Sequence, residues 1–540
     1  MRVLFINPPY RRFLRQETKI FPLGLGYLAS SLKRLKNVDV RILDLELSND
    51  RNEVITFYDT FLETKFLNEQ INNKTHKVYQ DLIEILEEFQ PDIVAISILT
   101  NKILSALQVA KITKKVLKKV IICAGGVYPT IAPEDFKDYH EFDFIFSGES
   151  EQTFYEFIKN FNETNKRNII IENNNEIDIN EIKYPLRNNV ISKYSISSDY
   201  YSGILLSRGC PFNCSYCNSP LIWKTKKIRY RNIENIIAEL EYLKTNFQIK
   251  HFYLWDDNIF LNKAYLEKFC EELKKSELKL TWSGQLRIEK IDRDILNILT
   301  EAGCNEIYLG IESGSANIQK NINKKFNLQV LQEKIEIIKE YPIIIGCYFI
   351  MGFPEEEISD LFNTYNLMQS INPDDAQLNL FNVLPKTGYY YKYFANKKIN
   401  WANHSQQHLS NYIFSKFSKE EYEEKMLYFA KKFDEHNESK KKEKILKRYN
   451  FANQFGFELD NITIYNLASL FEQENNFDKA LTNFKKLLDT NFKTDGVNYH
   501  LASIYFKQQN KTLANQYLNK CLEINPNFTV ATKLKEELNK

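Results

Sequence analysis

The sequence has no apolar run close to the roughly 20 residues that a transmembrane helix needs, so we expect no membrane span. Its opening residues, 1–9, are too few for the apolar core of a signal peptide. It has only eight cysteines, three in one short loop and the rest scattered, which is unlike a secreted disulfide scaffold. These absences predict a cytoplasmic protein.

The sequence also has almost no net charge. Its 72 basic and 70 acidic residues leave a formal charge of +2, so the basic surplus of a general nucleic-acid binder is missing and no nucleic-acid partner is expected. The apolar share of 43% and the charged share of 26% are ordinary for globular proteins. A length of 540 residues predicts about three or four domains.

Residues 1–165 alternate strand and helix patterns, which predicts a doubly wound, Rossmann-like α/β domain. Strands are expected at 2–7, 38–43, 91–97 and 120–124, and all but 38–43 are apolar on both faces, as in a buried parallel sheet. The segment 38–43 alternates like an edge strand. Residues 166–199 read as a linker with at most one short strand.

The segment Ser207–Asn218, here named the cysteine loop, places thiols at Cys210, Cys214 and Cys217. Three cysteines spaced CxxxCxxC can ligate three irons of one cubane iron–sulfur cluster and leave the fourth iron open. The alternative is a structural zinc site, which needs four ligands, usually as two spaced pairs. No second pair follows, and the nearest later candidates, His251 and Cys270, are isolated.

Residues 200–390 continue as about six βα units, with strands expected at 204–207, 251–255, 279–283, 306–310, 343–351 and 375–381. Active sites of α/β barrels gather at the carboxyl ends of the strands. Asp256 and Asp257 directly follow the second strand. They are candidates for binding a cation or acting as a base, and a helix cap or a structural hydrogen bond explains them equally well.

The cysteine spacing resembles that of the radical S-adenosylmethionine (SAM) enzymes. This resemblance implies a partial (β/α)6 TIM-type barrel, with a 4Fe-4S cluster on the three cysteines and sensitivity to oxygen. It also implies that the open iron chelates SAM, which is cleaved to methionine and a 5′-deoxyadenosyl radical. The matching positions imply SAM-site roles for these residues: Tyr216, Arg287, Gly310, Glu312, Ser313, Gly352 and Pro354. A packing aromatic and plain turns remain the alternatives for Tyr216 and for the two glycine motifs.

The first domain resembles the cobalamin-binding domain that precedes the barrel in one branch of these enzymes. The likeness is carried by 7–9, 22–25, 125–130 and 142–151, and it implies that cobalamin lies against Gly125, Gly126, Gly148 and Glu149. Two glycines after a strand fit a tight turn equally well. The Asp-x-His-x-x-Gly motif that supplies a histidine to cobalt in many cobalamin proteins is absent. His76 and His140 read as surface histidines, so cobalt would be held without this ligand.

Residues 391–455 read as a helical connector whose Lys/Glu-rich end predicts a solvated helix face. In residues 456–540 the pattern recurs after 34 residues, with Leu467 and Ala480 matched by Leu501 and Ala514, which resembles tetratricopeptide repeats. Arrays of this kind imply a peptide substrate or a protein partner. A dimer contact, or packing against the barrel, is the alternative.

The family resemblance implies methyl transfer to an unactivated carbon or phosphorus, dependent on SAM, cobalamin and an electron donor such as flavodoxin or ferredoxin. The substrate is expected to be a small molecule or a peptide. The first alternative is a radical rearrangement or cyclisation without methyl transfer. The second is an interaction protein that works through its repeats and carries a vestigial barrel.

Overall fold

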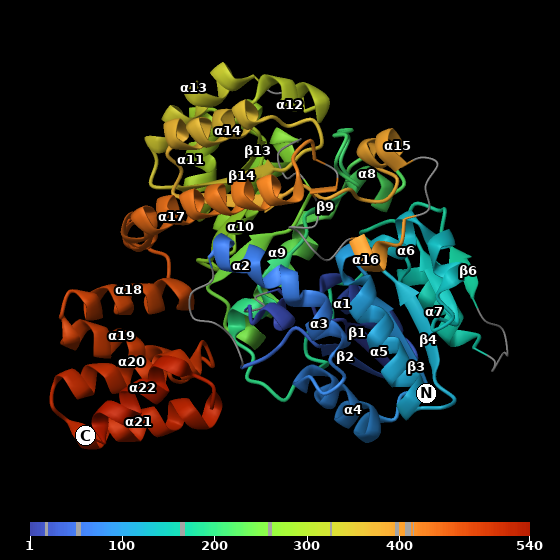
Figure 1. Cartoon of the computed structure of the whole chain (residues 1–540), viewed down its shortest axis with the longest axis horizontal. Coiled ribbons are helices and arrows are strands. Elements are labelled where there is room, and N and C mark those ends of the chain that lie inside the picture. Colours follow the sequence, from blue (N-terminus) through green and yellow to red (C-terminus); the bar gives the residue numbers. More distant parts are fainter. Residues whose placement is uncertain are drawn as a thin grey trace.

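The computed structural model describes residues 1–16, 20–49, 56–161, 168–257, 262–324, 327–394, 399–404, 412–413 and 415–539. Two parallel sheets and a C-terminal array of helices make up this part of the chain (Figure 1). Within it, no helix is both long and apolar enough to cross a membrane.

The first sheet has seven parallel strands in the order β6-β5-β4-β3-β1-β2-β7. Their bounds are β1 (Arg2–Asn7), β2 (Asp39–Asp44), β3 (Ile93–Ser97), β4 (Ile121–Gly125), β5 (Phe144–Ser147), β6 (Ile169–Glu172) and β7 (Val190–Ile191). Helices pack on both faces of the sheet, with α4 and α5 on one and α1 and α7 on the other. The doubly wound domain predicted from the sequence is therefore confirmed.

The helices of this region, in chain order, are α1 (Leu23–Leu32), α2 (Phe57–Glu63), α3 (Leu67–Asn72), α4 (Lys77–Phe89), α5 (Ile103–Val116), α6 (Val127–Ile131) and α7 (Glu151–Lys159). Short 3-10 turns connect several of them: η1 (Arg11–Leu14), η2 (Thr64–Phe66), η3 (Thr100–Lys102), η4 (Pro133–Asp138) and η5 (Ser198–Tyr201).

The segment expected to be a linker instead supplies both edge strands of this sheet. Strand β6 pairs with β5, and the two residues of β7 pair with Ile42 and Leu43 of β2. The prediction that 38–43 forms an edge strand was therefore wrong. A two-residue strand is too short to leave a pattern, and Asn189 helps hold it by donating its side-chain amide to the Val40 carbonyl at 2.7 Å.

The second sheet has six parallel strands in the sequential order β15-β14-β13-β12-β11-β8, which confirms the partial barrel. These are β8 (Gly203–Ile204), β11 (His251–Leu254), β12 (Thr281–Leu286), β13 (Cys304–Glu312), β14 (Ile344–Met351) and β15 (Asp375–Leu380). The strand expected at 204–207 divides in two. Its second part, β9 (Ser207–Arg208), leaves the barrel and pairs antiparallel with β10 (Arg229–Tyr230).

Helices cover the outside of this barrel (Figure 1): α9 (Ile233–Phe247), α10 (Lys263–Lys275), α11 (Arg293–Glu301), α13 (Leu328–Lys339) and α14 (Ile358–Ile371). Shorter elements lie in the connections: α8 (Ser219–Ile222), the 3-10 turn η7 (Ile288–Lys290), α12 (Ala316–Asn321), α15 (Gly388–Phe394) and α16 (Trp401–His404). Of these, α12, α15 and α16 place residues in the core that α4 and α5 form on the first sheet.

The long helix α17 (Lys419–Phe455) joins the barrel to the repeats. It begins in a capping box between Ser418 and Glu421 and ends at Gly456, whose φ of 73° suits glycine. Its expected solvated end is partly buried against the barrel. Lys444 pairs with Asp375 at 2.7 Å, and Arg448 pairs with Glu306 at 2.6 Å.

The C-terminal helices form two antiparallel pairs and a last helix, as the 34-residue period predicts. They are α18 (Asn461–Gln473), α19 (Phe477–Leu487), α20 (Thr494–Lys507), α21 (Lys511–Ile524) and α22 (Thr529–Leu538). Ala480 and Ala514, one from each repeat, are fully buried in the cores between these helices.

The ion pair between Glu306 and Arg448 gives a prediction about stability. Glu306 is 1% exposed, and its carboxylate also accepts a hydrogen bond from the Tyr308 hydroxyl at 3.0 Å. Glu306→Ala leaves the Arg448 guanidinium buried without this partner, which should lower the free energy of unfolding by about 3–5 kcal/mol. Urea titration of the barrel's transition measures the loss. The control Glu443→Ala removes a half-exposed partner of Lys440 and should cost under about 1 kcal/mol. Equal losses in the two variants would contradict the structural role of the buried pair.

Candidate functional site

The cysteine loop lies between β9 and α8, beyond the carboxyl end of β8. Cys210, Cys214 and Cys217 are all partly buried and carry free thiols. Gly209, just before the first thiol, has a φ of 112°, and a Cβ there would lie 2.4 Å from the Lys227 carbonyl oxygen. Only glycine lets the loop close this tightly against the segment that leads into β10.

Backbone hydrogen bonds hold the loop from its other side. The Ser215 amide donates to the Ile322 carbonyl at 2.9 Å, and the Ser215 carbonyl accepts from the Tyr389 amide at 3.0 Å. The Asn323 side chain donates to the Asn213 carbonyl at 2.9 Å. The turn after α12 and the start of α15 therefore fix the segment that carries the three thiols.

Asp256 has a structural role. Its carboxylate accepts hydrogen bonds from the amides of Leu206 and Ser207 and from the Ser207 hydroxyl, at 2.5 to 3.1 Å. Burial raises its pKa to about 6. Asp257 accepts from the Trp223 indole nitrogen at 2.6 Å. Of the two explanations considered for this acidic pair, the structural hydrogen bond is the one observed at Asp256.

The donor set of the loop is three thiols, which a cubane cluster can take as ligands of three different irons, and this assignment stays a prediction. The described residues contain no group of three or more His, Cys, Asp or Glu side chains that could hold one metal ion. Each thiolate of a cubane binds a different iron, so its ligands lie farther apart than those of one zinc ion. Burial raises the pKa of the Cys210 thiol and raises that of Cys217 to about 11. The charge of Cys214 adds to both shifts, which indicates that the three thiols lie near one another.

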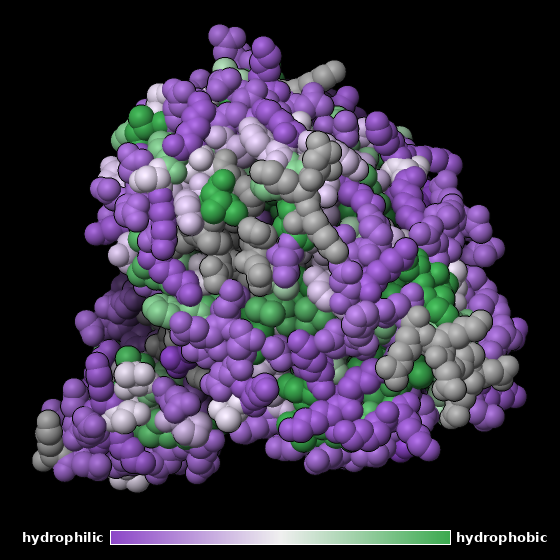
Figure 2. Space-filling model, turned by 45° about the vertical axis from the view of Figure 1, so that its right-hand side comes forward, coloured by the Kyte–Doolittle hydropathy of each residue, from purple (hydrophilic) through white to green (hydrophobic). Residues whose placement is uncertain are grey.

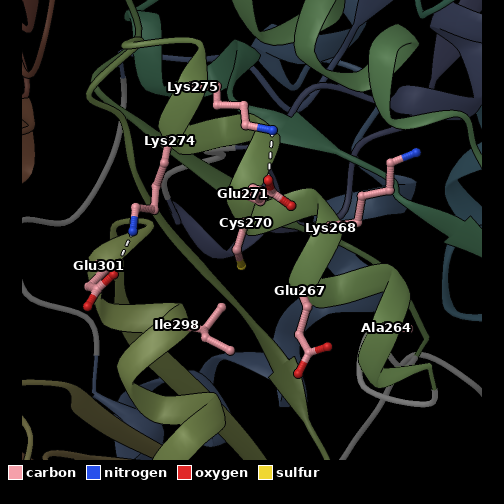
Figure 3. A pocket seen from close by; sticks show the side chains of 9 residues that line it. All are labelled: Ala264, Glu267, Lys268, Cys270, Glu271, Lys274, Lys275, Ile298 and Glu301. Atoms are coloured by element: carbon pink, nitrogen blue, oxygen red, sulfur yellow. Dashed lines mark hydrogen bonds and ion pairs between the residues drawn. The ribbon is translucent and has the colours of Figure 1, made fainter.

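The two isolated residues considered for zinc do not join the loop. The His251 ring is buried and bonds to the hydroxyls of Thr281 and Ser283 at 2.9 and 3.2 Å. Cys270 lies on α10, beside a surface hollow of about 620 Å³ (Figure 3). Figure 3 shows Glu271 paired with Lys275 and Glu301 paired with Lys274, and Cys270 itself is buried.

Glu312 is the residue at which the loop and the first SAM-type motif meet. It sits at a bulge of β13 with a φ of 68°, an uncommon backbone for a residue other than glycine, and strain of this kind gathers at functional sites. Its carboxylate acts electrostatically on Tyr216 of the cysteine loop and pairs with the Lys324 ammonium at 2.6 Å. Burial and the charge of Glu312 raise the pKa of Tyr216.

Gly310 and Ser313, which flank Glu312 in the motif, have different structural roles. A Cβ on Gly310 would lie 2.7 Å from the Glu312 carboxylate and 2.8 Å from the Lys324 ammonium, so the missing side chain makes room for this ion pair. Ser313 is buried and its hydroxyl bonds to the Thr364 hydroxyl at 2.9 Å. Ser313 therefore shapes the turn, as the alternative of a structural turn predicts.

The second motif lies beside the same loop. Gly352 has a φ of 90°, and a Cβ there would lie 2.5 Å from the Tyr422 hydroxyl of α17. Glu356 accepts hydrogen bonds from the amides of Gly352 and Phe353. The Phe353 ring meets the Tyr216 ring edge-on at 6.4 Å, and Pro354 is buried behind it.

Arg287 also reaches the cysteine loop. Its guanidinium lies 3.8 Å from the centre of the Phe212 ring and pairs with Glu289 at 2.5 Å. The structure thus brings the loop together with Tyr216, Arg287, Glu312 and the Gly352 motif. Their assignment to SAM remains a prediction.

The glycines assigned to cobalamin occupy the carboxyl edge of the first sheet. Gly126 has a φ of 99°, and a Cβ there would lie 2.9 Å from the Ile98 amide. The Gly125 carbonyl accepts from that amide at 2.8 Å. Gly148 has a φ of 94° and lies against the Asn173 carbonyl. These contacts fit tight turns, so cobalamin contact at these glycines stays a prediction.

Glu149 bridges the first domain and the cysteine loop. Its carboxylate pairs with Arg208 at 2.6 Å and with Arg229 at 2.8 Å, and Glu151 pairs with Arg208 at 2.7 Å. Arg208 is the residue before Gly209 in the loop and Arg229 lies opposite on β10, and the side chains of both are 7% exposed. We name this group of four charges the loop clamp.

Sequence reasoning missed Lys324, Arg208 and Arg229. Lys324 follows α12 and gave no local signal, because only the fold brings it to Glu312. Arg208 directly precedes the cysteine motif. Because a buried arginine is nearly always paired, its position beside a buried loop predicts an acidic partner elsewhere in the chain.

Three family models match this chain. The radical SAM superfamily matches residues 204–368, the B12-binding domain matches 15–158, and the tetratricopeptide repeat matches 463–494 and 496–528. They confirm the predicted family, an enzyme rather than an interaction protein, and the cofactor set of a 4Fe-4S cluster, SAM and cobalamin at the level of the domains.

Curated relatives cover most of the chain. An uncharacterized methyltransferase of Pyrococcus horikoshii is 28% identical over 427 residues, which is 75% of this chain and 86% of the relative. An anaerobic magnesium-protoporphyrin IX monomethyl ester cyclase of Rubrivivax gelatinosus is 25% identical, covering 71% and 68%. A cytidylyl-2-hydroxyethylphosphonate methyltransferase of Streptomyces wedmorensis is 24% identical, covering 65% and 73%.

Solved structures share the fold. The radical SAM methyltransferase TsrM of Kitasatospora setae superposes with a TM-score of 0.53 at 15% identity, covering 72% of this chain and 74% of that one. The cobalamin-dependent SAM radical enzyme OxsB has a TM-score of 0.50 at 15% identity, covering 99% and 80%. The chain therefore combines a domain that matches the radical SAM superfamily with a B12-binding domain and tetratricopeptide repeats.

Proposed function

We propose that this protein is a cobalamin-dependent radical SAM methyltransferase that acts on an unactivated carbon or phosphorus atom. The convergence of the cysteine loop, Glu312 and the Gly352 motif at one end of the barrel carries the proposal. The names of two relatives, each a methyltransferase, support methyl transfer as the reaction.

The cysteine loop would hold the cluster through Cys210, Cys214 and Cys217. When bound there, a reduced 4Fe-4S cluster supplies the electron that cleaves SAM. Tyr216 and the Phe353 ring would form one wall of the SAM site. The two rings contact each other edge-on with their centres 6.4 Å apart, an arrangement that aromatic pairs prefer.

Glu312 would accept hydrogen bonds from the ribose hydroxyls of SAM. Its Oε1 atom is paired with the Lys324 ammonium at 2.6 Å, and its side chain is only 9% exposed. An ionised carboxylate makes stronger hydrogen bonds to hydroxyl groups than a neutral one. Gly310 and Gly352 would support the SAM site indirectly, because the first makes room for the Glu312–Lys324 pair and the second for the Tyr422 hydroxyl.

The loop clamp would set the position of the B12-binding domain over the barrel. Gly125, Gly126 and Gly148 lie at the edge of that domain's sheet, and Glu149 directly follows the last of them. A shift of Glu149 therefore moves the proposed cobalamin edge relative to the cysteines. Buried, paired charges suit this task because they tolerate few alternative arrangements.

A ring-forming reaction is the second candidate, because one relative is named as a cyclase. The two candidates differ in their products: methyl transfer from SAM yields S-adenosylhomocysteine, whereas a methyl-free radical reaction yields 5′-deoxyadenosine alone.

The decisive experiment is anaerobic reconstitution with iron, sulfide, hydroxocobalamin, SAM and a reductant such as reduced flavodoxin. We expect bound corrinoid in the optical spectrum and both 5′-deoxyadenosine and S-adenosylhomocysteine as products. Deoxyadenosine without corrinoid or S-adenosylhomocysteine would reject methyl transfer and favour the ring-forming candidate.

The cluster assignment predicts the behaviour of cysteine variants. Replacing Cys210, Cys214 and Cys217 by Ala removes all three proposed iron ligands, so bound iron should fall to background and deoxyadenosine formation should drop at least about 100-fold. Iron analysis and product assay test this. The control Cys270→Ala changes a thiol on α10 and should keep the iron content. Retained iron in the triple variant would contradict the assignment.

The role of Glu312 predicts a loss of SAM affinity. Glu312→Gln keeps the shape but removes the charge, and losing one or two charge-assisted hydrogen bonds should raise the Kd for SAM about 10- to 100-fold. Equilibrium dialysis measures it. Ser313→Ala, which alters the buried neighbour turned toward Thr364, serves as the control and should change the Kd by less than about threefold. Equal Kd values for wild type and Glu312→Gln would refute the assignment.

The loop clamp predicts uncoupling of the two products. Glu149→Gln weakens the link between the B12-binding domain and the cysteine loop while leaving the proposed SAM site intact. We expect the ratio of S-adenosylhomocysteine to 5′-deoxyadenosine to fall about 10-fold. The control is Glu156→Gln on α7, whose carboxylate accepts hydrogen bonds from the side chains of Gln152 and Asn160. A ratio unchanged by Glu149→Gln would mean that the clamp has only a structural role.

A further inference from the structure

One cavity of about 1450 Å³ connects the inside of the open barrel with the C-terminal repeats. In the barrel its wall includes Tyr253, Tyr308 and Tyr348, which lie on β11, β13 and β14. In the repeats its wall includes Asn466 and Gln473 of α18, and α20 also contributes. A ligand that lies against the repeats can therefore reach the barrel strands.

The barrel end of this cavity is lined in part by residues of β13, a strand that also carries residues assigned to SAM. Tyr308 and Tyr348 stack with their ring centres 5.2 Å apart. Tyr308 stands two residues before Gly310 on β13, so both face the same side of the strand. Glu312 follows across the bulge. Tyr308 and Tyr348 thus line the cavity, and Gly310 and Glu312 lie farther toward the carboxyl end of β13.

The repeats are held at a fixed place relative to this layer. Besides the pairs that α17 makes with the barrel, the Asn461 side chain at the start of α18 donates to the Ser198 hydroxyl at 3.0 Å. Lys442 of α17 pairs with Glu474 beyond the end of α18 at 2.8 Å. Figure 1 shows α18 directly below α17, beside the barrel. The surface of the repeats that lines the cavity therefore stays in a fixed position relative to the barrel.

The chemistry of the α18 surface matches a polypeptide backbone. Within the described part of the chain, the side-chain amides of Asn466 and Gln473 have no hydrogen-bond partner. Each can donate and accept, as a peptide group does. Asn466 and Gln473 are seven residues apart on α18, so they lie on the same face of the helix. Seven residues make two helical turns, which separate the two positions by about 10.5 Å. Three residues of an extended chain span about the same distance.

The cavity is also large for a small ligand. Sites for small molecules usually occupy roughly 300–1,000 Å³, and this hollow exceeds that range. Its lining mixes aromatic rings with charges of both signs, including Arg448 and Asp375. On the face shown in Figure 2 the repeats form a largely hydrophilic lobe, which fits a surface that binds a chain from solution rather than an apolar dimer contact.

We propose that the concave side of the repeats and the barrel interior form one continuous site for an extended polypeptide, so that the repeats seat the substrate itself and not a separate partner. The polypeptide lies along Asn466 and Gln473 and enters the barrel past the stacked tyrosines. The inference rests on the proposed radical chemistry in the barrel, and it identifies the substrate class as a peptide or protein.

The test uses the anaerobically reconstituted full chain and a displayed library of random 12-residue peptides. Selected peptides are synthesised with a fluorophore, and binding is measured by anisotropy. The double variant Asn466→Ala, Gln473→Ala should weaken binding at least about 10-fold. The matched control, Asn483→Ala with Gln508→Ala, removes two amides of the repeats that do not line the cavity and should leave the Kd within about twofold.

Photo-crosslinking then locates the bound peptide. A benzophenone at each peptide position in turn should give adducts both on α18 or α20 and on β13, β14 or β15. Adducts on the repeats alone would overturn the proposal and make the repeats a docking site for a separate partner. Failure to select any peptide would overturn it as well.

Deoxyadenosine formation by the same preparations, measured without peptide, separates this proposal from the proposed function. If wild type cleaves SAM but binds no peptide, the substrate class is wrong and the radical activity stands. If peptide binds across both regions but SAM is not cleaved, the polypeptide site stands and the radical function fails.

Discussion

The constraint on which this structure depends is that three thiols must stay together in residues 209–218, which form neither helix nor strand. A loop cannot hold them by its own backbone bonds, so its neighbours must. Asp256 fixes the start of the loop, Gly209 allows close contact with the segment before β10, and the turn at Ile322 fixes its middle. The open barrel provides these neighbours because its strand ends meet at one edge.

Buried charges link the parts of the chain. Glu149 ties the first domain to the loop through two arginines, and Glu306 ties the barrel to α17 through Arg448. Pairs of this kind add little net stability, because the cost of removing two charges from water offsets their attraction. They do fix orientation, since each partner left alone would be costly. Both links therefore fix how parts of the chain that are far apart in the sequence lie against each other.

The parts of the fold that follow from local patterns were predictable. The parallel sheets, the six barrel strands and the repeats each leave a periodic signal, and the cysteine spacing fixes the position of the site. The edge strand β7 has only two residues and the role of Lys324 depends on distant packing, so neither leaves such a signal. Lys444 was read as a solvated residue because a helix rich in Lys and Glu looks the same whether its charges meet water or Asp375.

The same reasoning bears on how the repeats relate to the catalytic domain. Two repeats bury little surface of their own, and arrays this short need neighbours for stability. Here α17 and the barrel supply that support, which fixes the repeats rather than leaving them on a flexible tether. Repeats that recruit a separate partner work over a larger volume when their attachment is flexible. Repeats that position one segment of a substrate polypeptide at one place in the barrel need a rigid attachment. The attachment of α18 next to the barrel cavity is therefore better explained by positioning a substrate than by capturing a partner.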